Sequence, residues 1–335
     1  MRQVPLVRAA HFNLYLSVLR EIGVPVWDCL TRAGLPATTE ESPDLYLSLP
    51  RIMDFVAQDG GAGGAMELGF MAAQRATLRD LRPEFRQAIL NAQSGFALLQ
   101  TFLRYRKGED TAAFSAIYPE GASVRVVCDQ PGLEHTAGFV CTEWMNLQAV
   151  VSIVRCIAGA AWTPEEVTFV SDFAPHDRAK EAFPNTRMLM SQIHTSVLVP
   201  RDVLARPSNS PVVPETGDCE EHAEISHSAG PLDTIREIVK PYFREKPLLL
   251  LEVAEILGMS QRTLQRQLNN MGVSYSRLVA EARYQVACDL LANLDIKITD
   301  IAIATGYQNP SHFSRAFRRF AGLSPIEYRM SASAQ

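Results

Sequence analysis

The sequence predicts two domains of different class. The first is an α+β N-terminal domain, with helices packed on a small, mostly antiparallel sheet. The second is an all-α C-terminal domain, with two helix-turn-helix units joined by a long helix. Three observations predict this division. The hydrophobic period changes from 3.6 residues to 2 and back within the first 200 residues. A short pattern occurs twice between residues 253 and 320, and a Pro-rich acidic stretch precedes it. We expect domains at 1–205 and 232–330, with a linker at 206–231.

Length and charge agree with a modular chain. A length of 335 residues suggests two domains, and a composition of 47% apolar and 21% charged residues is that of an ordinary globular protein. The net charge is −5, but residues 232–330 carry 13 Lys and Arg against 10 Asp and Glu, a net +3. The remainder therefore carries −8. The C-terminal end is the one suited to an anionic partner.

The N-terminal domain should begin with helices. Apolar residues at helical spacing predict helices over 11–22, 26–33, 49–57 and 65–73. The Gly-rich turn at 60–64 is not a phosphate-binding loop, because it lacks the GK[ST] sequence and a flanking strand. Pro83 should open a longer helical region, whose 3.6-residue period is kept by Phe85, Ile89, Ala92, Phe96, Leu99, Phe102 and Leu103.

A change of period then predicts the sheet. Residues 112–118 and 123–128 are expected to be strands joined by the turn Pro119-Glu120-Gly121. A helix should follow over 143–157, and further strands are expected over 166–170 and 193–199. Helices packed on a small sheet are typical of an α+β domain.

The first copy of the repeated pattern indicates a helix, a tight turn and a second helix. It runs through Val253-Ala254, Gly258-Met259 and Leu264, Arg266 and Leu268. Gly258 suits the left-handed conformation that ends a helix, and Ser260 is a favourable N-cap for the next one. Leu264 and Leu268 lie four residues apart and should face inward, with Arg262, Gln265 and Arg266 outward.

The second copy follows at an offset of 48 residues up to the glycine and 49 after it. It runs through Ile301-Ala302, Gly306-Tyr307 and Phe313, Arg315 and Phe317. Asn309 should cap the second helix, and Pro310 suits its first position. Phe313, Phe317 and Phe320 should face inward. The outer face keeps Arg and small polar groups, the kinds of side chain that contact base edges in the major groove.

A third helix, from Ser274 to Asn293, should separate the two copies. Its expected apolar stripe comprises Tyr275, Leu278, Val279, Ala282, Val286, Leu290, Leu291 and Leu294. At 1.5 Å per residue it would span about 27–30 Å. Recognition helices that enter successive turns of the major groove lie about 34 Å apart. A rigid helix of this length is suitable as the spacer.

The C-terminal segment resembles the DNA-binding domain of AraC/XylS-type bacterial transcription regulators. The likeness covers residues 232–329 and is carried mainly by the second copy: Ile298-Thr299-Asp300-Ile301-Ala302, Gly306-Tyr307, the run from His312 to Arg319, Gly322-Leu323-Ser324-Pro325 and Tyr328-Arg329. Thr305 stands where many members carry Cys or a small apolar residue. The resemblance implies binding of double-stranded DNA in two successive major grooves.

The residues expected to contact DNA share an outward position on the second helix of each copy. They are Gln261, Arg262, Thr263, Gln265, Arg266, Ser311, His312, Ser314, Arg315, Arg318 and Arg319. Arg266 and Arg315 are expected to contact guanine, and Arg262, Gln265 and His312 are further candidates for base contact. Arg318 and Arg319 are assigned to phosphates. The alternative for each arginine alone is an ordinary solvated helix face.

Residues 1–205 resemble the arabinose-binding-domain-like branch of the same family. The likeness rests on Thr77-Leu78-Arg79-Asp80, the run from Phe102 to Tyr105, the run from Gly159 to Pro164, and Leu198-Val199-Pro200. It implies an effector-sensing domain that also forms a homodimer. Arg104, Tyr105, Arg106 and Trp144 could serve a polar ligand, but we favour Trp144 in the core and the arginines at the surface. We assign no ligand residues.

Cysteines and linker residues give no metal site. The six cysteines form no CxxC pair, so we expect reduced and mostly buried thiols. Cys219, His222, Glu224 and His227 could suggest a metal, but a polar, exposed linker with incidental histidines is the favoured interpretation. We therefore expect no metal and no cofactor. A signal peptide and a membrane span are also not expected, which indicates a cytoplasmic protein.

Three functions remain open. The favoured one is a transcription regulator, an activator by resemblance, whose activity a small-molecule effector modulates; contact with RNA polymerase would be compatible with it. The second is a regulator controlled by a protein partner or by its own concentration. The third is an enzyme tethered to DNA. Because no catalytic motif is present, we expect no enzyme and name no catalytic residue.

Overall fold

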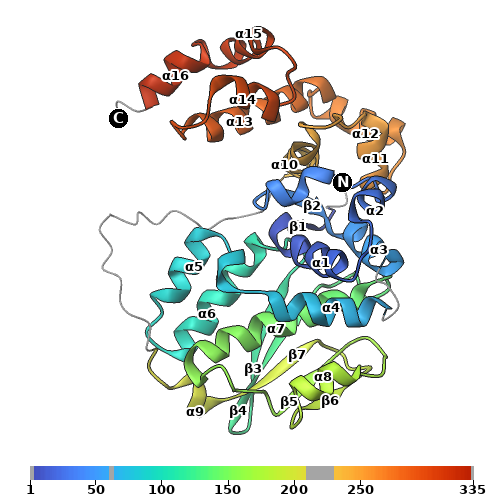
Figure 1. The fold of residues 1–335 in the computed structure, drawn as a ribbon, viewed down its shortest axis with the longest axis vertical. Coiled ribbons are helices and arrows are strands. Elements are labelled where there is room, and N and C mark those ends of the chain that lie inside the picture. Colours follow the sequence, from blue (N-terminus) through green and yellow to red (C-terminus); the bar gives the residue numbers. More distant parts are fainter. Residues whose placement is uncertain (1–3, 60–63, 209–229, 333–335) are drawn as a thin grey trace. The chain divides into compact units, whose positions relative to one another are not determined.

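The computed structural model describes residues 4–59, 64–208 and 230–332 (Figure 1). Its contacts divide the chain into two compact units. The sensor unit, as we call it, comprises Pro5–Leu35 and the described part of Leu49–His227. The second, here called the helical unit, comprises Val4, Pro36–Ser48 and the described part of Ser228–Gln335. Residues 60–63 of the predicted turn at 60–64, and most of the predicted linker, lie outside the described residues.

The sensor unit begins with one short strand and a series of helices. These are β1 (Leu6–Arg8), α1 (Ala9–Glu21), α2 (Val26–Ala33), α3 (Leu49–Asp59), α4 (Gly64–Arg75), the 3-10 helix η2 (Leu78–Asp80), α5 (Pro83–Leu90), α6 (Gly95–Tyr105) and the 3-10 helix η3 (Arg106–Gly108). The four helices predicted before residue 75 are all present, with ends shifted by a few residues.

The sheet has five strands in the order β3-β4-β7-β5-β6. They are β3 (Phe114–Glu120), β4 (Ser123–Asp129), β5 (Glu166–Thr168), β6 (Arg187–Leu189) and β7 (Ser196–Pro200), and they are accompanied by α7 (Phe139–Ala158), α8 (Asp177–Ala182) and α9 (Arg201–Leu204). Every neighbouring pair is antiparallel except β5 and β6, which are parallel. The predicted α+β class with a small, mostly antiparallel sheet is confirmed.

Helix α7 is the centre of the sensor unit. It packs on β4 and β7 on one side and on α4 on the other, and α4 packs on α1 (Figure 1). The approach of α4 to α7 requires Gly69, because a Cβ there would lie 2.5 Å from the Cα of Cys141. Trp144 lies within the core, with ring centroids of Phe70 and Phe169 at 5.0 and 4.8 Å.

The helical region predicted after Pro83 is present as two helices, α5 and α6, because residues 91–94 interrupt it. Ser94 caps α6 by accepting a hydrogen bond from the Ala97 amide at 3.2 Å. Gly95 is held against α9, where a Cβ would lie 2.7 Å from the Cα of Leu204. Apolar residues of both α5 and α6 pack in one core. The predicted 3.6-residue hydrophobic period therefore continues across the interruption. Phe96, however, is 48% exposed.

The helical unit contains the expected two helix-turn-helix motifs and spacer. Its elements are η1 (Ala37–Glu41), β2 (Tyr46–Ser48), α10 (Pro231–Val239), η4 (Lys240–Tyr242), α11 (Leu250–Ile256), α12 (Gln261–Asn270), α13 (Tyr275–Leu291), α14 (Ile298–Ala304), α15 (Pro310–Ala321) and α16 (Pro325–Ala332). Four of these elements were not predicted: α10, α16, η1 and β2. Strand β2 packs on α10.

The spacer α13 is shorter than predicted. Its 17 residues give a length of about 25 Å. Its buried residues are Leu278, Ala282, Ala287 and Leu291, whereas Leu294 lies beyond its end and is 62% exposed. The hydroxyl of Tyr275 donates to the carbonyl of Leu248 at 2.6 Å, and Glu281 pairs with Arg236 at 2.9 Å. These contacts fix the start of α13 against the elements around α10 and α11.

Candidate nucleic-acid interface and effector cavity

In the first helix-turn-helix motif, one face of α12 is buried and the other is exposed. Gly258 has φ +64° between α11 and α12, and the Ser260 hydroxyl accepts from the Thr263 amide at 3.2 Å. Leu264 and Leu268 are fully buried, as predicted. The opposite face is therefore turned outward by the period of the helix.

The α12 residues predicted to contact DNA fall into two groups. Gln261, Arg262 and Arg266 are exposed. Thr263 and Gln265 are half-buried and have local partners: the Thr263 hydroxyl lies 2.9 Å from that of Ser260, and the Gln265 amide donates to Asn269 at 3.1 Å. The exposed group is directly available to a ligand, whereas these two side chains must exchange local hydrogen bonds.

The second motif repeats this arrangement with α15. The Asn309 side chain accepts from the Ser311 amide at 2.8 Å, and Pro310 occupies the first turn. Phe313 and Phe317 are 2% exposed and pack with Ile301 and Ala302 in a small core. Phe320, predicted to face inward, is 40% exposed; its ring instead stacks on Tyr284 at 5.3 Å between centroids.

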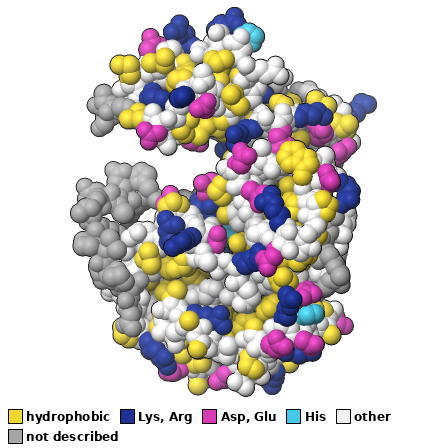
Figure 2. Space-filling model, in the orientation of Figure 1, with side chains coloured by type: hydrophobic (Ala, Val, Ile, Leu, Met, Phe, Trp, Pro, Cys, Tyr) yellow, Lys and Arg dark blue, Asp and Glu magenta, His cyan; other side chains and the backbone are white. Residues whose placement is uncertain are grey.

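Most polar residues of α15 lie on its outer face. Ser311, His312, Arg315, Arg318 and Arg319 are exposed, and Ser314 is half-buried. Arg318 lies 3.5 Å from Glu327 of α16. Across the described part of the chain, the guanidinium groups of Arg266 and Arg315 have no recorded hydrogen bond or ion pair. Basic side chains gather over α15 in Figure 2, where they can attract an anion.

The turn before α15 is fixed by close packing. Gly306 has φ +81°, and a Cβ there would lie 2.6 Å from the carbonyl oxygen of Phe243. The guanidinium of Arg283 lies over the rings of Tyr307 and Phe243, at 5.1 and 5.4 Å from their centroids. Thr305 is fully buried, and its hydroxyl donates to the Ile301 carbonyl at 2.7 Å. A rigid turn of this kind fixes the direction of α15.

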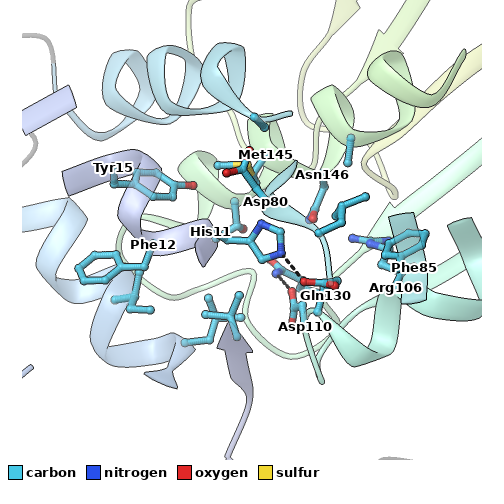
Figure 3. Close-up of a pocket in the computed structure, with 18 of the residues that line it drawn as sticks. His11, Phe12, Tyr15, Asp80, Phe85, Arg106, Asp110, Gln130, Met145 and Asn146 are labelled. Atoms are coloured by element: carbon cyan, nitrogen blue, oxygen red, sulfur yellow. Dashed lines mark hydrogen bonds and ion pairs between the residues drawn. The ribbon is translucent and has the colours of Figure 1, made fainter. Parts of the chain in front are cut away.

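The sensor unit contains a cavity of about 110 Å³ (Figure 3). Its walls are mostly apolar and come from α1, α3, α5, α6 and α7. Examples are Phe12, Ile52, Phe85, Phe102 and Met145. Polar groups gather at one end, where Arg106, Asp110 and Gln130 lie beside His11 (Figure 3). An apolar cavity with few convergent polar groups is the usual form of a small-molecule site.

Arg106 is buried at this polar end. It is 5% exposed, and its Nη1 donates to the Phe114 carbonyl at 2.9 Å and to the Ser115 hydroxyl at 2.5 Å. Its Nη2 is buried without a hydrogen-bond partner. A buried guanidinium nitrogen left without an acceptor is costly, so an acceptor from a bound molecule would stabilise the site.

Gln130 and Asp110 form a second polar pair. The Gln130 amide donates to the Asp110 carboxylate, which also accepts from the Ala112 amide at 2.8 Å. Burial raises the pKa of Asp110, against the hydrogen bond from Gln130 and the charge of Arg106. The Gln130 Oε1 atom is buried without a partner. At this end of the cavity, the Arg106 Nη2 donor and the Gln130 Oε1 acceptor are therefore both buried without a partner.

Glu109, by contrast, is fully occupied. It accepts from Arg8 Nη1 at 2.6 Å and from the Arg82 amide at 3.1 Å, and it lies 2.9 Å from His11. Burial alone would raise the pKa of Glu109, but His11 and Arg8 outweigh it and lower the pKa to about 2. The carboxylate is thus a charged structural centre in the lining of the cavity.

The sequence interpretation of these side chains was partly wrong. Trp144 is in the core, as favoured, and Arg104 is exposed. Arg106, however, is buried against the cavity and not at the surface. His11, Asp110 and Gln130 were not singled out. A signal was present in α7, where Thr142, Met145, Asn146 and Ala149 recur at helical spacing and line one wall.

The described cysteines and helices add no further site. Cys29, Cys128 and Cys141 are buried, Cys288 is partly buried and Cys156 is exposed. Within residues 4–59, 64–208 and 230–332, no group of three or more His, Cys, Asp or Glu could hold a metal ion. The linker residues Cys219, His222, Glu224 and His227 lie outside the described residues. None of the described helices combines the length and the apolar character needed to cross a membrane.

Comparisons with known proteins match both parts of the chain. Residues 23–208 match a family described as the arabinose-binding domain of AraC transcription regulator, N-terminal, and residues 253–331 match a helix-turn-helix domain. An uncharacterised HTH-type transcriptional regulator of Mycobacterium tuberculosis is 41% identical over 88 residues, 26% of each chain. The chain thus spans about a quarter of the length of the first curated relatives it matches.

Other matches extend over nearly the whole chain. The ornithine utilization regulator of Pseudomonas aeruginosa is 27% identical over 332 residues, which cover 97% of this chain and 96% of that protein. The crystal structure of the transcriptional regulator CdpR from Pseudomonas aeruginosa covers 96% of both chains at 19% identity, with a TM-score of 0.41.

Proposed function

Because the chain belongs to the AraC family of DNA-binding transcription regulators, which are not enzymes, we propose that it binds a specific operator through α12 and α15 and responds to a small molecule held in the sensor unit. DNA binding through the helix-turn-helix domain is the family's property. The operator contacts, the effector and the dimer are proposals. The observation that supports a small-molecule effector is the cavity, beside which the Nη2 atom of Arg106 is buried without a hydrogen-bond partner.

The DNA contacts follow from the outer faces of α12 and α15. Arg266 and Arg315 are exposed on helices whose opposite faces are fixed by buried Leu264, Leu268, Phe313 and Phe317. We assign them bidentate contacts to guanine. Arg262, Gln265 and His312 are further base-contacting candidates, with Gln261, Thr263, Ser311 and Ser314 beside them. Arg318 and Arg319 are assigned to phosphates, which position the protein without specifying sequence.

The chain path offers a route from the cavity to the helical unit. Residues Pro36–Ser48 belong to the helical unit by their contacts, although both flanking segments belong to the sensor unit. There the Thr38 amide donates to Glu245 at 2.8 Å, and Arg244 pairs with Glu41 at 2.8 Å. The segment continues directly into Leu49 and Ile52, which line the cavity. A ligand that favours one position of α3 can therefore bias the segment attached to the DNA-binding domain.

Dimerisation through residues 1–205 and action as an activator, including contact with RNA polymerase, are part of the proposal and rest on the family. Control by a protein partner or by expression level, with no small molecule, is the competing account. Thermal shifts across a metabolite library distinguish the two, because a specific ligand raises Tm by mass action. The test is completed by an Arg106→Gln variant, which should lose the shift, beside Arg104→Gln, which should keep it. A library without any hit that depends on Arg106 would favour the competing account.

A further inference from the structure

The polar end of the cavity also indicates the chemical class of the effector. Resting on the proposed effector function, we infer that the cavity takes a small uncharged molecule with an apolar body and one polar head, and that this head both accepts a hydrogen bond from Arg106 and donates one to Gln130. A primary carboxamide is the simplest head of this kind.

The acceptor on the ligand is required by Arg106. Its Nη1 already has two partners, the Phe114 carbonyl and the Ser115 hydroxyl, so the guanidinium is held in place. The Nη2 group is buried and has no partner. Since a guanidinium only donates, the atom that meets Nη2 must be an oxygen or another acceptor.

The donor on the ligand is required by Gln130. Its Nε2 is used on Asp110, and its Oε1 is buried without a partner. Gln130 itself is 3% exposed, so bulk water does not reach it readily. A carboxylate or ketone has no hydrogen to offer to this oxygen, whereas an amide N–H does.

The charges around the cavity argue against an anionic head. Glu109 is compensated by Arg8, His11 and Arg82. Asp110 is 7% exposed, and Arg106 acts on its carboxyl electrostatically, so the positive charge of Arg106 already faces a buried acid. The cavity lining holds the carboxyl groups of Asp80, Glu109 and Asp110 beside Arg106 and His11, so a ligand carboxylate would add a further negative charge to a wall that already carries three acidic groups. Burying an unbalanced charge is far costlier than burying an amide.

The volume of the cavity and its apolar walls indicate the size and character of the rest of the ligand. The cavity volume of about 110 Å³ is the space open to the centres of water-sized spheres. In this measure, one water needs roughly 10–15 Å³. The space therefore accommodates about ten non-hydrogen atoms. Phe12, Ile52, Leu81, Phe85, Phe102 and Met145 offer only apolar contact. The body of the ligand should be an aromatic ring or a short hydrocarbon chain.

Three probe molecules of equal size test separately whether the polar head of the ligand needs an acceptor, a donor and the absence of charge. Phenylacetamide carries an acceptor and a donor, phenylacetate carries acceptors and a negative charge, and 1-phenylpropan-2-one carries an acceptor alone. We expect millimolar phenylacetamide to raise Tm of the full chain by about 2–4 °C. The other two should raise Tm by less than half as much. Octanamide, octanoate and 2-nonanone repeat the comparison with a chain in place of the ring.

Variants locate the binding. Arg106→Gln and Gln130→Met should each abolish the amide-specific shift, and Arg104→Gln, which replaces an exposed arginine two residues earlier at the end of α6, should leave it unchanged. Because buried polar substitutions can unfold the chain, Ala149→Leu gives an independent test: it fills the cavity wall and keeps every polar group. The Ala149→Leu chain should retain its circular dichroism spectrum and lose the response to both amides.

The outcomes are distinct. A larger shift with phenylacetate or octanoate than with the amides would overturn the uncharged head, while the proposed effector site would stand. An amide shift that survives Ala149→Leu would overturn the cavity as its location. No shift with any of the six probes would overturn this inference. The proposed function would fail separately, if no metabolite altered either Tm or operator binding in an Arg106-dependent way.

Discussion

The Nη1 atom of Arg8 donates to Oε2 of Glu109 across 2.6 Å, between side chains that are only 3% and 6% exposed. Two segments about a hundred residues apart are joined there, and Glu109 also lines the cavity. The pKa of Glu109 is lowered to about 2 from 4.5, since His11 and Arg8 outweigh the effect of burial.

This pair makes stability depend on pH. A carboxyl whose folded pKa is depressed contributes stability that is present above its unfolded pKa and lost as pH falls through the folded value. We expect the wild type to be more stable than Glu109→Gln at pH 7, with the part due to ionisation amounting to about 3 kcal/mol. Urea unfolding should show the gap narrowing between pH 4.5 and 2. A gap that stays constant over this range would contradict the assignment.

Gly306 and Gly258 occupy equivalent turns but differ in their surroundings. Both have positive φ, yet a Cβ at Gly306 would lie 2.6 Å from the Phe243 carbonyl, and one at Gly258 would meet nothing within 4 Å. Gly258→Ala should therefore cost about 1–2 kcal/mol through its conformation alone. Gly306→Ala should cost clearly more, because backbone must also move. Equal losses in chemical denaturation would show that the close approach to Phe243 is not important.

Binding to DNA should weaken steeply with salt, because the proposed contacts of Arg318 and Arg319 would neutralise phosphates. Arg318→Ala and Arg319→Ala should each weaken binding to specific and unrelated DNA alike, and should reduce the slope of log K against log salt by about 1. Fluorescence anisotropy from low to physiological salt measures this slope. Arg277→Ala, an exposed arginine on α13 that pairs with Glu281, is the matched control. A slope unchanged in both α15 variants would remove them from the phosphate contacts.

Variants of the ion pair between Arg244 and Glu41 test the proposed coupling of the cavity to the helical unit through the segment Pro36–Ser48. Both side chains are partly exposed, so the pair should contribute about 0–1 kcal/mol to stability. Arg244→Glu should instead reduce the effect of an effector on operator affinity, by disturbing the hold on the segment Pro36–Ser48. The charge-swapped pair Arg244→Glu with Glu41→Arg should restore it. An effector response that is identical in all three proteins would contradict this route.

The sequence predicted the two helix-turn-helix motifs of the helical unit well, because their elements are specified locally. Ser260, Asn309 and Pro310 mark where α12 and α15 begin, and the spacing of Leu264 and Leu268 determines the buried face. Elements that depend on distant partners were missed. The break before α6 depends on Gly95 meeting Leu204, although Ser94 was a local signal. The burial of Arg106 depends on β3, whose carbonyl and hydroxyl groups lie 8 and 9 positions further along.

The cavity could not be predicted from local sequence patterns, because its residues come from distant parts of the chain. Its polar end combines His11 from α1, Arg106 from η3 and Gln130, which follows β4. No spacing rule relates these positions. The two residues proposed for base contact, in contrast, lie at matching places in a repeated motif, so the repeat itself pointed to them.

The most direct test of the account is binding of the selected operator by Arg266→Ala and Arg315→Ala. Operators are first selected from random DNA by the full chain, and affinities are then measured against every single-base substitution. Each variant should lose about 1–3 kcal/mol and relax the preference at one base, with the two bases about one helical turn apart. Wild-type affinity and specificity in both variants would contradict the claim that α12 and α15 read DNA together.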